Sequence, residues 1–336
     1  MSRTLPRPLT RLEARLAAAV QAGIGWLGSP VSRAEAQFQR RSAHPRRGRW
    51  LGTAMFGTCA GAVTLAVLRG VIAANPGWFR APLDVILLVW DAVMAFTHSV
   101  LIFCVAAHYF SMLAGAVQAS TGAVVREKTA RTWETLLLTG VDARALVIGK
   151  WAATLSQVWR QHRRLLLPRL CAIAWLGLTT AVSEPYSGVS VPALISVPFV
   201  TVLAALALPV INIALGAAIG LVGSLFGSTP SSARAAASLL QGSLVVLVFI
   251  LSILLVPMAG ASEWTVIVLP MAFSSFDGGI TAVLTLPHSI IFGERLLIFI
   301  VVTFGYAAAA GGAIWGLLRL AERLAVRQNV SPHPQP

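Results

Sequence analysis

The chain has 336 residues, of which 57% are hydrophobic and only 11% are charged. Soluble domains usually carry about 25% charged residues, so this composition excludes an ordinary soluble protein and indicates a membrane protein with several spans. The formal net charge is +14, but the basic residues gather beside the apolar stretches and form no basic-aromatic nucleic-acid module. We therefore expect lipids as neighbours and no nucleic-acid partner.

The cysteines give no sign of a metal site or of a disulfide framework. There are three, all within or beside apolar stretches, and none belongs to a CxxC pair: Cys59, Cys104 and Cys171. Isolated cysteines in such surroundings usually behave as small buried apolar side chains. We expect no bound metal and no cofactor in this chain.

The N-terminal stretch, residues 1–49, is strongly basic and contains an apolar stripe. The stripe recurs at spacings of four and three: Leu12, Leu16, Val20, Ile24 and Leu27. This spacing predicts an amphipathic helix, and its basic flanks favour a position in the headgroup plane of a membrane. The alternative is a helix that packs on another cytoplasmic part of the protein.

Six apolar stretches follow that are long enough to be membrane-spanning helices. They are residues 50–74, 84–108, 165–182, 194–225, 236–259 and 294–318. The fold class predicted is an all-α, polytopic membrane protein with a six-span transmembrane domain over 50–325 and a disordered tail over 326–336. In the fourth stretch, Gly216 with Gly220 and Gly223 with Gly227 predict close helix packing, within the chain or between two copies.

The distribution of Lys and Arg predicts the orientation. They concentrate in residues 1–49, in 109–164 and in the C-terminal tail, whereas the opposite loops hold only Arg80. The positive-inside rule then places both termini in the cytoplasm, and an even number of spans agrees with this. Residues 260–293 hold no Lys or Arg and are apolar in two short pieces, which favours re-entrant or interface-lying helices on the outer side.

Polar side chains inside the spans form a possible intramembrane path. Asp91 and His98 are seven residues apart on one helix face, and Asn212 lies beside two prolines of the fourth span. Ionisable groups in a span usually face a bundle interior or a water path. They could serve a proton-coupled carrier or an intramembrane enzyme, or simply form a hydrogen-bonded seam between helices.

The most charged segment between the spans is residues 125–151, which we expect to form a cytoplasmic helix-turn-helix. Glu127 with Arg131, and Arg131 with Glu134, have the spacing of helical ion pairs. Trp133 and the leucines after it would form one apolar face, and Asp142 would cap the second helix. Such a short helix suits docking into a groove of a soluble partner, although a hairpin packed on its own protein is the alternative.

This segment resembles the cytoplasmic loop of ABC-2 type transporter permeases. The matching residues are Glu127, Lys128, Thr132, Trp133, Glu134, Leu136, Leu137, Leu138, Thr139, Gly149 and Lys150. The family usually has Gly where Arg131 stands and often Pro where Gly140 stands. The six-span layout, the amphipathic N-terminal helix and the apolar segment before the last span are also similar to the family.

The resemblance implies the membrane subunit of an ABC exporter, not an enzyme, in a bacterial inner or plasma membrane. It would work with a second permease copy or paralogue and with a separate cytoplasmic ABC ATPase that binds ATP and Mg²⁺. This chain has no phosphate-binding GxxxxGK[ST] motif and no catalytic residues that we recognise. The residues expected to couple it to the ATPase are Glu127, Arg131, Trp133, Glu134, Leu136, Leu137, Thr139 and Lys150.

Overall fold

The computed structural model describes residues 30–31, 33–35, 37, 49–74, 83–138, 142–183, 191–259 and 293–330. Within these ranges all regular structure is helical and no strand is found, as the sequence predicts. The helices are α3 (Arg49–Ala74), α4 (Leu83–Thr129), α5 (Trp133–Leu138), α6 (Ala143–Ser183), α7 (Val191–Phe226), α8 (Pro230–Ala259) and α10 (Gly293–Val330).

Three of these helices are long and apolar enough to cross a membrane. The apolar windows are Gly52–Arg69 in α3, Leu88–Thr129 in α4 and Thr201–Phe226 in α7. These windows coincide with the first, second and fourth predicted spans. Three long apolar helices of this kind indicate a membrane-embedded protein. The other predicted spans fall on α6, α8 and α10, where the crossing itself stays a prediction.

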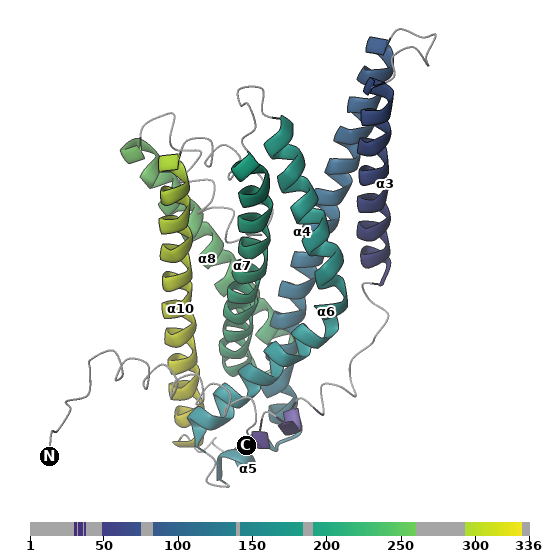
Figure 1. Ribbon diagram of the computed structural model, residues 1–336. Coiled ribbons are helices and arrows are strands. Elements are labelled where there is room, and N and C mark those ends of the chain that lie inside the picture. Colours follow the sequence, from purple (N-terminus) through teal and green to yellow (C-terminus); the bar gives the residue numbers. More distant parts are fainter. Residues whose placement is uncertain are drawn as a thin grey trace, which may run out of the picture.

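Helix α7 is the centre of the molecule and α3 lies at its edge (Figure 1). α7 packs against α4, α6, α8 and α10, whereas α3 packs mainly against α4 and α6 among the described helices. Accordingly, 67% of the apolar window of α7 is buried inside the protein, against 17% of that of α3. The exposed apolar side chains of α3 suit contact with lipid.

The small residues of α7 allow its neighbours to approach closely, as predicted from their spacing. A Cβ atom added at Gly220 would lie 2.9 Å from the carbonyl oxygen of Val117 in α4. One added at Gly223 would lie 2.8 Å from the backbone nitrogen of Ala237 in α8. Contacts this short leave no room for a side chain, so both glycine pairs are used within the chain itself.

Two helices extend far beyond the apolar stretches that predict them. α4 has 47 residues and α6 has 41, so each runs without interruption from its apolar stretch to the hairpin. α10 continues to Val330, which corrects the expectation of disorder over 326–330. Ala325 is buried there, and the Gln328 side chain donates to the Leu225 carbonyl oxygen over 2.8 Å, contacts that stabilise the extra turn.

Some predicted features lie outside the described residues. They are the amphipathic helix over residues 12–27, the re-entrant segment up to residue 292, Thr139, and the tail beyond residue 330. The described positions between 30 and 37 are helical and contact the hairpin through Glu35.

Candidate functional site

The hairpin that joins α4 to α6 begins with a tight turn centred on Arg131. The Thr132 amide donates to the Glu127 carbonyl oxygen over 2.9 Å, and the Arg131 amide donates to that of Lys128 over 3.1 Å. Together with the positive φ of 56° at Arg131, these bonds form a Schellman ending of α4. The chain then turns sharply into α5.

This turn corrects the predicted ion pair between Glu127 and Arg131. Arg131 is exposed and makes no ion pair with Glu127, because the helix has already ended and the four-residue spacing no longer places the two on one face. Arg131 and Glu134 are separated by the same turn, and the Glu134 side chain lies outside the described part. The predicted cap at Asp142 is confirmed, since its Oδ1 accepts the Arg144 amide over 3.2 Å.

Trp133, the first residue of α5, points into the protein. Its side chain is 4% exposed and belongs to an apolar cluster contributed by four further helices. The other buried members are Val124 of α4, Leu146 and Val147 of α6, Leu221, Val222 and Leu225 of α7, and Ala321 and Ala325 of α10. Trp133 therefore anchors α5 to the helix bundle.

The opposite side of α5 faces outward at the end of the molecule (Figure 1). Thr135 is exposed and Leu136 is half-buried, so these two are the described α5 residues that an outside partner would meet. The Leu137 side chain, like Thr139, lies outside the described part.

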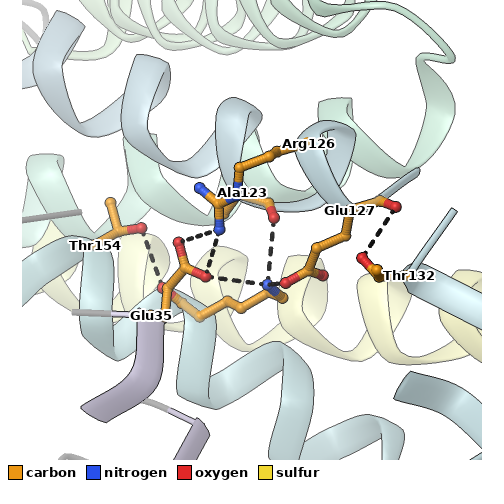
Figure 2. Close-up of polar contacts among 7 residues, drawn as sticks. Glu35, Ala123, Arg126, Glu127, Thr132 and Thr154 are labelled. Atoms are coloured by element: carbon orange, nitrogen blue, oxygen red, sulfur yellow. Dashed lines mark hydrogen bonds and ion pairs between the residues drawn. The ribbon is translucent and has the colours of Figure 1, made fainter. Parts of the chain in front are cut away.

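Four charged side chains meet beneath the hairpin, and we call them the buried charge network: Glu35, Arg126, Glu127 and Lys150 (Figure 2). The Lys150 ammonium, 2% exposed, lies 2.5 Å from Glu127 Oε1 and 3.3 Å from Glu35 Oε2. It also donates to the Ala123 carbonyl oxygen over 3.3 Å. The Arg126 guanidinium donates to both oxygens of Glu35, over 3.1 and 2.9 Å.

This network balances two acids against two bases, which is what burial requires. An unpaired charge is costly in a buried position, and each partner removed leaves another group without compensation. Because Glu35 comes from the segment at 30–37, Arg126 and Glu127 from α4 and Lys150 from α6, the network fixes three separate segments against one another.

A second polar contact holds the end of α7 beside the hairpin. The Lys128 ammonium lies 2.7 Å from the Leu225 carbonyl oxygen and 3.2 Å from that of Ser224. Carbonyl oxygens at a helix C-terminus lack intrahelical donors and carry partial negative charge, so a cation there is stabilising. Through Lys128, α4 therefore holds the C-terminal end of α7 next to the hairpin.

Sequence reasoning placed Glu127 and Lys150 in the site but missed Glu35, Arg126 and Lys128 as its partners. The contacts of these three residues join positions that lie 91 to 115 residues apart along the chain. A local spacing pattern cannot reveal contacts between such distant positions. One feature of the sequence does point to Glu35. The chain has 12 acidic residues against 26 basic ones, so an isolated glutamate is expected to pair with a lysine or arginine elsewhere in the chain.

The predicted intramembrane path is not assembled by the described contacts. Asp91 pairs with Arg69 of α3 over 3.2 Å, with both side chains about half exposed. Asn212 accepts a 2.5 Å hydrogen bond from Tyr306 of α10. His98 Nε2 is buried and has no hydrogen-bond partner among the described residues. The described residues also contain no cluster of His, Cys, Asp and Glu that could hold a metal ion.

Another buried polar contact lies between α4 and α6. The ring nitrogens His108 Nε2 and His162 Nδ1 are 3.2 Å apart. Arg169, fully buried nearby, donates to the Val105 carbonyl oxygen over 2.9 Å. These contacts add polar links between two long helices, and they involve none of the residues of the predicted path.

No family model, no curated protein and no solved structure matches this chain. The role of the hairpin therefore has to be argued from its geometry and from the sequence motif that it contains.

Proposed function

We propose that the chain is the membrane-spanning permease subunit of an ATP-binding-cassette exporter of the ABC-2 type. In this proposal it has six spans, both termini in the cytoplasm of a bacterial cell, and a second permease copy or paralogue beside it. A separate cytoplasmic ATPase supplies the energy by binding and hydrolysing ATP. The motif of the hairpin and the geometry around α5 support the proposal.

The observation that carries the proposal is the mechanical position of α5. It lies between two long uninterrupted helices, at the end of the bundle (Figure 1). At this end of the protein, Trp133 packs against residues of four other helices, and the buried charge network links α4 to α6. Movement of α5 caused by an ATPase would thus be passed to α4, whose apolar window, Leu88–Thr129, is long enough to cross a membrane.

Within this proposal, the residues of the hairpin have two different roles. Trp133 acts as the anchor that holds α5, and Glu127 and Lys150 fix the helices to which it is attached. The docking surface is formed by the outward side at Thr135 and Leu136. A short helix with an apolar and small-polar outer side fits a groove on a partner.

The turn at Arg131 gives the resemblance a physical basis. The residue there has a positive φ, a conformation that glycine adopts without steric cost. The family usually has glycine at this position. The same helix ending would therefore suit both the family pattern and this chain.

Cross-linking from the outer side of α5 tests the proposal. Cys59, Cys104 and Cys171 are replaced by serine, and one cysteine is introduced at Thr135 to carry a photoreactive maleimide. The matched control is Val85→Cys, since Val85 is 55% exposed and lies near the opposite end of α4, two residues after Leu83. We expect the Thr135 probe to capture a Walker-motif ATPase in native membranes and the Val85 probe to capture none.

Two results would refute the proposal. One is modification of the Thr135 cysteine by a membrane-impermeant maleimide in intact cells, which would place α5 outside. The other is transport by the purified chain in vesicles that contain no ATPase.

A further inference from the structure

The exposed side of α10 changes from apolar to basic along the helix. Val301 and Phe304 are 60% and 72% exposed, as expected of side chains that face lipid. Towards the hairpin end comes Trp315, also exposed, and then Arg319, Arg323 and Arg327 at successive spacings of four. Residues four apart lie on one side of a helix. Along this side, apolar residues are followed by a tryptophan and then by arginines, the order expected where a helix passes from the lipid core through the membrane interface.

A groove lies at this depth between α6 and α10, and we call it the α6–α10 groove. Val147, Ile148 and Leu318 line its apolar part, and Trp315 adds an aromatic wall. Arg144 of α6 and Arg319 and Glu322 of α10 border the groove, whose exposed interior is almost entirely apolar.

The residues that border the groove carry a net positive charge. The Arg319 guanidinium lies 5.4 Å from the centre of the Trp315 ring and 3.5 Å from Glu322. Arg144 is exposed and forms no ion pair with any residue that the structure describes, and the same is true of Arg323 and Arg327 just beyond the groove. A single carboxylate therefore faces several guanidinium groups.

We propose that the α6–α10 groove binds an anionic phospholipid of the leaflet on the α5 side. Guanidinium groups recognise phosphate oxygens through paired hydrogen bonds. Basic pockets between membrane helices bind anionic lipid headgroups, and tryptophan is enriched at the level of those headgroups. Arg144 and Arg319 would hold the phosphate, with an acyl chain against Trp315 and Leu318.

Two features favour a lipid over a soluble anion or a protein. The groove continues into apolar side chains, which a free phosphate would leave exposed to water. The exposed apolar surface of α10 also extends away from the hairpin to Val301, a distance of more than ten residues along the helix, and lipid covers such a surface in a bilayer. The inference does not depend on the proposed transport function.

A bound lipid would also stabilise the hairpin end. Arg144 lies in the first turn of α6, directly after the Asp142 cap, whereas Arg319 belongs to α10. A phosphate shared by the two would tie the start of α6 to α10. We therefore expect anionic lipid to raise the thermal unfolding midpoint of the full chain, and phosphatidylcholine to raise it less.

The test measures binding of a photoactivatable phosphatidylglycerol to the full chain in phosphatidylcholine nanodiscs. The variant Arg144→Gln/Arg319→Gln removes both groove charges, and Arg131→Gln/Arg234→Gln removes two exposed arginines outside the groove. Each basic residue near an anionic lipid contributes about a factor of five, so we expect the groove variant to bind on the order of 25-fold more weakly. The control should bind within about twofold of the unmodified protein.

Further arms identify the ligand and guard against misfolding. The variant Arg144→Lys/Arg319→Lys keeps both charges and should retain most of the lipid binding. The photoactivated lipid should label peptides from α6 and α10. The proposal is overturned if phosphatidylcholine competes equally, or if soluble glycerol 3-phosphate displaces the lipid. It is also overturned if the Gln variant binds lipid normally but loses a protein partner, because the groove would then be a protein interface.

Discussion

Two sets of opposite charges in this protein differ in how much structure they support. The buried charge network joins three segments through side chains as little as 2% exposed, whereas the Arg69–Asp91 pair joins α3 to α4 with side chains 48% and 56% exposed. The first set lies beside the central helix α7 and the second at the edge of the molecule. The comparison indicates that the hairpin end is fixed by mutual burial and that α3 is held mainly by its apolar contacts.

The strongest test of this comparison is Lys150→Met, which keeps an apolar stem but removes the ammonium. Glu127 and Glu35 then lose a buried cation, and we expect a loss of about 3 to 5 kcal/mol of stability. The thermal unfolding midpoint of the purified protein in detergent measures it. The matched change at the edge, Arg69→Ala, should cost less than about 1 kcal/mol because that pair is exposed.

The origin of the Lys150 effect is separable by a second substitution. Removing the paired acid as well, in Lys150→Met/Glu127→Gln, should restore a large part of the lost stability because the buried carboxylate is no longer uncompensated. Equal midpoints for the single and double variants would show that the Lys150 stem, and not its charge, stabilises the hairpin.

Trp133→Ala should have the next largest effect, about 3 kcal/mol, because it removes a large buried side chain from the cluster shared by five helices. Membrane insertion should remain intact. Under the proposed function, ATP hydrolysis by the partner ATPase should also fall, because α5 loses its anchor. The matched control is Trp159→Ala, since Trp159 is 52% exposed on α6. A normal unfolding midpoint together with lost coupling would show that Trp133 contacts the partner directly.

The sequence predicted the parts of this structure that depend on local composition. The apolar windows of α3, α4 and α7, the Asp142 cap and the close approach at the α7 glycines all follow from short-range patterns. It failed where distant segments decide the local structure. α4 continues through Arg126 and Lys128 because Glu35 and the end of α7 compensate those charges, and neither partner is near in sequence.

The apolar face of α5 shows the same limit. An apolar tryptophan beside leucines fits a surface patch or an anchor equally well, and only the positions of α6, α7 and α10 decide between them. Among the intramembrane residues, Asn212 also has a partner, Tyr306, that lies 94 residues away. Pattern reasoning therefore finds candidate groups in such a chain but does not assign their partners.

Paired glycine substitutions extend the comparison between the centre and the edge to helix packing. Gly220→Ala should destabilise by about 1 to 3 kcal/mol, because the new methyl group meets the Val117 carbonyl oxygen in the tightly packed α4–α7 contact. Gly61→Ala in α3 meets no atom within 4 Å and should be neutral or stabilising by up to about 1 kcal/mol. Unfolding midpoints that fall equally for the two variants would mean that α3 has a partner not seen here.

The smallest expected effect is a gain, from Arg131→Gly at the turn of the hairpin. A non-glycine residue in the left-handed region carries a steric cost of about 1 kcal/mol, and glycine removes it while leaving the two Schellman hydrogen bonds in place. Because Arg131 is exposed and outside the buried charge network, no compensating contact is lost. The unfolding midpoint should rise slightly, whereas Arg131→Val, which is β-branched, should lower it. A fall with glycine would mean that the arginine side chain itself stabilises the hairpin, and that the turn is held by more than its backbone.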